Sequence, residues 1–133
     1  MKKPITIDYY QGAYGPTIRM DVHSAEGLVA LRNILHALAA GGTRERRFHQ
    51  LSFVELIEIY DIILTCVRTR RNKTVVAERK QEGDKMIFHW SNTLEGWSQC
   101  AELLDGISGT KPAHQYLSQE GLDDALIVVA FLE

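Results

Sequence analysis

A stretch near the C-terminus brings together the residue types that most often carry acid–base or metal chemistry. It holds His114 and Tyr116, and Asp123 with Asp124 follows a few residues later. An imidazole near two adjacent carboxylates is suited to share a proton or to hold a cation. The same residues also suit a structural role, in which the His and Tyr anchor a loop and the aspartates cap backbone groups. We favour the structural interpretation and keep a small enzyme using His114 with Asp123 or Asp124 as the alternative.

No other motif in the sequence predicts an active site. The chain has no glycine-rich phosphate loop, no His-Glu pair at helical metal spacing, no Gly-x-Ser-x-Gly elbow and no Cys-x-x-Cys. The five histidines lie on separate predicted elements, and each is expected to be structural: His23, His36, His49, His89 and His114. A site assembled from distant residues would escape this search. We expect no catalytic residue, no cofactor and no metal.

Two basic clusters flank the apolar middle of the chain. The first is Arg44, Arg46 and Arg47, and the second runs from Arg68 through Arg70 and Arg71 to Lys73. If folding brings them together, they would form a phosphate-binding surface. A nucleic-acid-binding domain is expected to be basic overall, whereas this chain has a pI near 6.2. Nucleic-acid binding is therefore the less favoured alternative, and charged, solvated loops are the simpler interpretation.

Composition places the chain among ordinary globular proteins. It has 133 residues, of which 45% are hydrophobic and 24% charged, so we expect one domain over residues 1–133. The start of the chain lacks the apolar segment of a signal peptide, and no apolar run is long enough to span a bilayer. A soluble, cytoplasmic protein is expected. Residues 86–133 hold seven acidic residues and one lysine, a net charge of −6, which favours a basic partner.

Hydrophobic periodicity predicts the first half of the fold. Alternation over residues 5–10 and 17–22 predicts a β-hairpin, and the leucine spacing after Ser24 predicts a capped helix that ends at Gly41. Residues 51–57 suit a short strand or a helical turn. Runs over 59–69, 74–80 and 85–91 predict three strands, with a turn at 81–84, that form an antiparallel meander.

The second half is predicted to add one helix and one strand. Asn92 followed by Glu95 suggests a capping box, and the buried stripe of the helix would be Leu94, Trp97, Ala101, Leu104 and Ile107. Residues 125–132 are apolar on both faces and should lie in the middle of the sheet. The order is ββα-βββ-α-β. It predicts an α+β two-layer sandwich in which two main helices pack on a mostly antiparallel sheet.

Aromatic and sulfur side chains divide between the core and the surface. Trp97 lies on the helical stripe and is predicted to be buried. Trp90 lies where a strand meets the helix, so we expect it to be half exposed and able to anchor a partner. Cys66 and Cys100 are interpreted as buried free thiols, because two cysteines in such a chain make neither a disulfide framework nor a zinc site.

The C-terminal half resembles the small bacterial immunity proteins that are encoded beside polymorphic toxins. The residues that carry the resemblance are Phe88-His89-Trp90, Thr93-Leu94-Glu95-Gly96-Trp97, Cys100-Ala101, Leu103-Leu104, His114-Gln115-Tyr116-Leu117 and Asp123-Asp124-Ala125. The resemblance implies a non-enzymatic cytoplasmic protein that binds and blocks a cognate toxin domain, often through an acidic surface.

The expected partner is thus a toxin domain, with no membrane and no cofactor involved. We expect the toxin contact to include residues of the C-terminal half, namely Trp90, Glu95, His114, Tyr116, Glu120, Asp123 and Asp124. The protein itself is expected to be a monomer or a weak homodimer, since edge strands allow pairing but no pattern requires it.

Overall fold

The computed structural model describes residues 3–69, 72–79, 85–118 and 123–132. In chain order its elements are β1 (Ile5–Gly12), β2 (Gly15–Val22), α1 (Ala25–Ala39), β3 (Glu45–Arg47), a 3-10 turn η1 (Phe48–Gln50), β4 (Val54–Ile57), β5 (Ile59–Cys66), β6 (Val75–Arg79), β7 (Met86–Asn92), α2 (Leu94–Asp105), β8 (Ala113–Tyr116) and β9 (Leu126–Phe131). The predicted α+β class with two main helices is confirmed. Glu120, one of the expected toxin contacts, lies outside the described residues.

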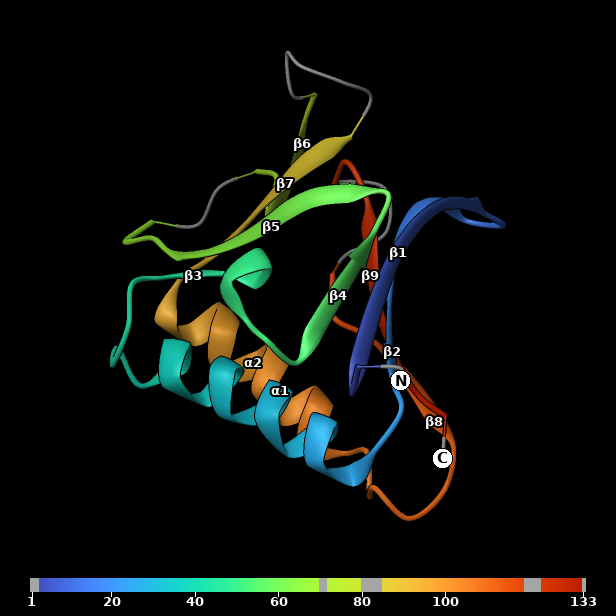
Figure 1. Cartoon of the computed structure of the whole chain (residues 1–133). Coiled ribbons are helices and arrows are strands. Elements are labelled where there is room, and N and C mark those ends of the chain that lie inside the picture. Colours follow the sequence, from blue (N-terminus) through green and yellow to red (C-terminus); the bar gives the residue numbers. More distant parts are fainter. Residues whose placement is uncertain (1–2, 70–71, 80–84, 119–122, 133) are drawn as a thin grey trace.

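The strands form two sheets rather than the single sheet predicted (Figure 1). One sheet has the order β4-β1-β2-β9-β8, and the other has the order β3-β5-β7-β6. Among the described strand pairs, four are antiparallel and three are parallel. The chain crosses from the first sheet to the second at Glu58, whose φ of 60° lies in the left-handed region. This sharp corner between β4 and β5 has no sequence signal such as glycine.

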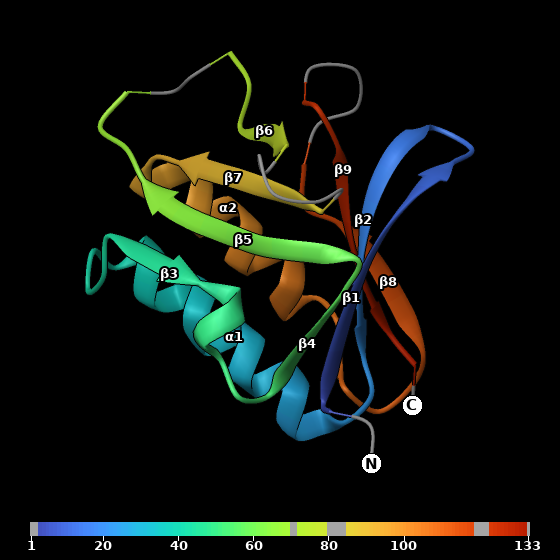
Figure 2. The same ribbon diagram turned by 45° about the horizontal axis from the view of Figure 1, so that its top comes forward.

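Both helices pack on one face of the four-stranded sheet, and the five-stranded sheet closes the side of the same core (Figures 1 and 2). The helices run antiparallel: the start of α2 at Leu94 faces Gly41, while Asp105 at its end bonds His36 of α1. The core between the layers includes the largest buried side chains of each, among them Phe88, Trp90, Trp97 and Phe131. One continuous hydrophobic cluster therefore joins both sheets and both helices.

The predicted antiparallel meander of three strands is wrong in one respect. β6 and β7 are antiparallel neighbours, but β5 pairs in parallel with β7, and β6 lies at the edge of the sheet. The physical reason is burial. β7 inserts Phe88 and Trp90 into the core, at 0% and 1% exposure, whereas β6 exposes Val76 at 40%. The more deeply buried strand takes the interior position and the half-exposed strand takes the edge.

The elements with strong local signals are confirmed. β1 and β2 form the antiparallel hairpin, and Ser24 caps α1 by accepting a hydrogen bond from the Gly27 amide at 3.0 Å. Such a cap contributes about 1 kcal/mol. β9 is buried at all six positions and lies between β2 and β8, as its apolar sequence predicts.

Two short strands and one helix start differ from the sequence prediction. β3 and β8 were expected as loops; they are three and four residues long and polar, which is typical of edge strands. The ambiguous run at 51–57 contains β4. α2 begins one residue later than predicted, because Thr93 rather than Asn92 caps it through the Gly96 amide. Leu94, assigned to the buried stripe, is 50% exposed, and Cys100 takes a place in the stripe instead.

Candidate functional site

The structure separates His114 from the two aspartates with which it was grouped. His114 lies on β8 and pairs with Ala130 near the far end of β9, while Asp124 precedes the start of β9. At about 3.3 Å per residue of extended chain, this places the imidazole roughly 15–20 Å from Asp124. The His114 ring is exposed, and its described ring contact is with Tyr116, edge to face at 6.4 Å. The hydrolytic or metal site considered from the sequence is therefore not assembled.

Asp123 and Asp124 instead attach the edge strand β6 to the segment that precedes β9. Asp123 accepts hydrogen bonds from the amides of Thr74 and Val75 at 2.6 and 3.1 Å, and from the Thr74 hydroxyl at 2.8 Å. Asp124 accepts from the Ala77 amide at 2.9 Å and from Lys73 at 2.8 Å. These bonds hold the pKa of Asp124 below its ordinary value, with Lys73 the larger cause and the Ala77 amide the second. The structural interpretation of this aspartate pair is the one the geometry supports.

Trp90 is 1% exposed, so the expectation of a half-exposed anchor is wrong. Its ring packs edge to face on Trp97 at 4.8 Å, inside the core between β7 and α2. The two tryptophans fill the space where the four-stranded sheet meets the helix. A partner cannot reach Trp90 without unfolding this region.

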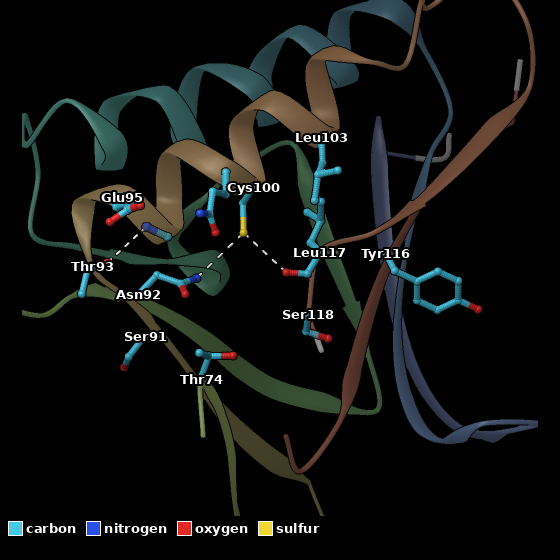
Figure 3. Close-up of a pocket in the computed structure, with 12 residues that line it drawn as sticks. Thr74, Ser91, Asn92, Thr93, Glu95, Cys100, Leu103, Tyr116, Leu117 and Ser118 are labelled. Carbon is cyan, nitrogen blue, oxygen red and sulfur yellow. Dashed lines mark hydrogen bonds between the residues drawn. The ribbon is translucent and has the colours of Figure 1, made fainter. Parts of the chain in front are cut away.

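Glu95 and Tyr116 lie at a hollow that runs along one face of α2 (Figure 3). We call it the α2 groove. Its volume is about 380 Å³. The helix contributes Glu95, Gln99, Cys100 and Leu103, and the opposite wall comes from Thr74, Ser91, Asn92, Leu117 and Ser118. Apart from Glu95 the lining is uncharged and rich in hydroxyl and amide groups. In Figure 3 the Tyr116 ring points away from the hollow, which it lines at the edge.

Cys100 forms part of the groove wall, and its thiol is hydrogen-bonded there. Its thiol donates to the Leu117 carbonyl oxygen at 3.4 Å and accepts a contact from the Asn92 amide at 3.9 Å (Figure 3). Burial raises the pKa of this thiol to about 12, so it stays protonated at neutral pH. Glycine at position 96 leaves room for the Asn92 side chain, because a Cβ there would lie 2.8 Å from the Asn92 side-chain oxygen. The groove is thus lined by a protonated thiol and, apart from Glu95, by uncharged side chains.

α2 exposes one leucine on each of two flanks, and two carboxylates that have no cationic partner among the described residues. Leu94 and Leu103 are 50% and 42% exposed, and Leu103 points into the groove toward Leu117. Glu95 and Glu102 are exposed and form no ion pair with any described residue. Exposed apolar side chains rimmed by charge are typical of a protein contact surface.

The structure brings part of the two basic clusters together. Arg44 and Arg68 line one hollow of about 650 Å³ at the start of α2, which we call the arginine hollow. Arg47 is paired with Glu45 at 3.1 Å, and Lys73 is paired with Asp124. Arg70 and Arg71 lie outside the described residues. Among the described residues, two cations of the two clusters therefore converge at this hollow.

Sequence reasoning missed a buried carboxylate, Asp61, which is 1% exposed. It accepts from the amides of His49 and Ile62 at 3.0 and 2.8 Å, and lies 2.5 Å from the His49 ring nitrogen Nδ1. The signal was present as a single acidic residue within an apolar strand, since such a residue is rarely buried without partners. These bonds fasten the η1 turn to β5. Neither of the two hollows described above is lined by His49.

Comparison of the chain with protein-family models, with curated proteins and with solved structures finds no match. In the described part of the chain, no cluster of three or more His, Cys, Asp or Glu side chains is placed to hold a metal ion. Neither described helix is long and apolar enough to cross a membrane.

Proposed function

We propose that this chain is an immunity protein that binds and neutralises a cognate toxin domain in the bacterial cytoplasm, with the outer face of α2 and the α2 groove as its contact surface. The observation that carries the proposal is the exposed Leu103 beside Glu95, a carboxylate with no ion pair among the described residues, at a preformed hollow. The resemblance of the C-terminal half to immunity proteins supports the same role.

The partner expected at this surface is a basic protein. Of the acidic side chains after residue 85, Asp105 bonds His36 and the aspartate pair bonds β6 and Lys73. Among the described residues this leaves Glu95 and Glu102 as the acids of that segment without a partner. Two carboxylates about two turns apart on the same face of α2 attract a basic patch, and they set its orientation more than they add to affinity.

Affinity would come from the apolar and polar parts of the surface. Burying the exposed parts of Leu94 and Leu103 contributes about 1 kcal/mol each. The groove accepts one partner side chain, whose polar end can bond Gln99, Ser91 or Ser118 and whose positive charge would meet Glu95. A side chain inserted in a well-packed pocket is typical of the residues that dominate a protein interface.

The first experiment is co-purification of the tagged chain with the products of the neighbouring genes. A stoichiometric partner that is toxic when expressed alone, and that this chain neutralises, is the expected result. Recovery of the chain without a partner, and no protection against the neighbouring gene products, would refute the proposal.

The contact surface is tested with matched variants of the two helices. Leu103→Ala on α2 should weaken the complex by about tenfold, while Val29→Ala, at a comparably exposed apolar residue on α1, should leave it unchanged. Glu95→Gln with Glu102→Gln should slow association, most strongly at low salt, and Glu55→Gln on β4 serves as the charge control. Equal affinities for the α2 variants and their controls would place the contact elsewhere.

A further inference from the structure

The arginine hollow lies at the junction of three elements that are distant in the sequence. Arg44 precedes β3 and Arg68 follows β5, and the antiparallel pairing of these strands brings the two residues to the same end of the sheet. The Cys66 amide donates to the Arg44 carbonyl oxygen at 2.8 Å, which fixes this register. The third wall is the first turn of α2, at Leu94 and Glu95.

The two arginines have no partner among the described residues, unlike several other basic side chains. Arg19, Arg47 and Lys73 each form an ion pair with a carboxylate, at 2.6, 3.1 and 2.8 Å. The side chains of Arg44 and Arg68 make no ion pair or hydrogen bond with any described residue, and both residues are exposed. Two free guanidinium groups at one hollow repel each other, and an anion between them removes that repulsion.

The start of α2 adds further donors to the same hollow. The amide of Gly96 is satisfied by the Thr93 hydroxyl, but the first two helical residues, Leu94 and Glu95, have no acceptor within the helix. Their amides and the helix dipole favour a bound anion. The Glu95 carboxylate also lines the hollow and opposes such a ligand. With two guanidinium groups against one carboxylate, the side chains still carry a net positive charge.

We propose that the arginine hollow binds a phosphate-bearing small molecule of about nucleotide size, with Arg44 and Arg68 holding the phosphate. A guanidinium group matches the geometry of phosphate oxygens with two parallel hydrogen bonds. The volume of about 650 Å³ falls within the usual range for small-molecule sites. A nucleic-acid backbone is a poorer fit, because Arg47 and Lys73, which would extend the track of cations, are already paired. This inference does not depend on the proposed toxin binding.

The test is a titration of the full, 15N-labelled chain, first with inorganic phosphate and then with a nucleoside monophosphate, at constant ionic strength. Saturable amide shifts at Thr43, Leu94 and Glu95 are expected. Arg44→Gln and Arg68→Gln should each weaken binding by about tenfold, and the pair together should abolish it. Arg19→Gln, whose arginine is paired with Asp21 on β2, is the control and should bind as the wild type does.

Glu95→Gln provides a test of opposite sign. Removing this carboxylate should tighten phosphate binding severalfold, although the same substitution should weaken the contact with a basic protein partner. The proposal is overturned if no saturable shift occurs below about 10 mM phosphate, or if the arginine variants bind as the wild type does. Circular dichroism of each variant checks that it is folded. We expect no loss of folding, because these side chains are exposed.

A single-stranded oligonucleotide distinguishes a small ligand from nucleic acid. We expect it to bind no more tightly than the mononucleotide, with a salt dependence that corresponds to one or two phosphate contacts. Much tighter binding with a steep salt dependence would overturn the small-molecule proposal in favour of nucleic acid.

Discussion

Two regions of the molecule contain carboxylates that differ in hydrogen bonding. One is the junction of the aspartate pair with β6, and the other is the outer surface of α2. At the junction, Asp123 and Asp124 are occupied by three backbone amides, one hydroxyl and one lysine. On α2, Glu95 and Glu102 have no described cationic partner. A carboxylate that is fully hydrogen-bonded within the chain stabilises the fold and is unavailable to a ligand, whereas an unpartnered one at a hollow is available. The comparison predicts which substitutions change stability and which change binding.

Among the charged side chains compared, the largest expected effect on stability is that of Asp123→Ala. The substitution removes three hydrogen bonds to a carboxylate and leaves the Thr74 and Val75 amides without their acceptor, so we expect a loss of about 2–3 kcal/mol in the free energy of unfolding. Urea denaturation measures it. Glu102→Gln, on α2, should change stability by less than about 0.5 kcal/mol. Equal effects of the two substitutions would contradict the distinction drawn between the regions.

Asp124→Asn should cost about 1 kcal/mol at neutral pH, and the cost should depend on pH. The pKa of Asp124 is lowered in the folded protein, so its contribution is present above the unfolded pKa of about 3.8 and is lost as the pH falls through the folded value. The wild type and the variant should therefore become equally stable in strong acid. A difference that does not change between neutral and acid pH would show that the charge of Asp124 has no role.

Thiol labelling tests whether the α2 groove is chemically inert. Burial raises the pKa of Cys100 to about 12, and burial also raises the pKa of Cys66, although the nearby charge of Arg44 opposes that rise. At pH 8 we expect the half-buried Cys66 to react slowly and Cys100 to react only as fast as the chain unfolds. Single-cysteine variants assign the two rates. Rapid labelling of Cys100 in the folded protein would argue for a reactive groove instead.

The smallest effect on stability is expected for substitution of Leu103. Substitution of its neighbour Leu104 should have a large effect. Leu103 is 42% exposed and Leu104 is 0% exposed, so these neighbours differ in burial but not in side chain. Leu103→Ala should cost less than about 0.5 kcal/mol, and Leu104→Ala about 2–5 kcal/mol. Thermal unfolding of both variants measures the contrast. A loss above about 1.5 kcal/mol for Leu103→Ala would make that side chain part of the core rather than of a contact surface.

Much of the local structure could be predicted from the sequence because the signals are local. The β1–β2 hairpin, the Ser24 cap of α1 and the fully apolar β9 follow from periodicity and capping. The division into two sheets could not be predicted, because the parallel pairings of β5 with β7 and of β2 with β9 join segments far apart in the chain. Such pairings depend on which strand buries most surface, and periodicity does not show this.

The candidate site was predicted only in part, for the same reason. Glu95 and Tyr116 do lie at one hollow, but Trp90 is buried and His114 lies far from the aspartate pair. Closeness in sequence grouped His114 with Asp123, while β8 and the segment before β9 place them at opposite ends of a strand. The meeting of Arg44 and Arg68 depends on the β3–β5 pairing, and the sequence gives no sign of β3 as a strand.

The most direct test of the account is the footprint of the toxin partner on the 15N-labelled chain. We predict that amide shifts and protection from hydrogen exchange concentrate on α2 between Leu94 and Leu103 and on the facing wall at Leu117 and Ser118. The β8 surface around His114 should be unchanged. A footprint centred on His114, with α2 unaffected, would contradict the account and place the contact surface on the five-stranded sheet.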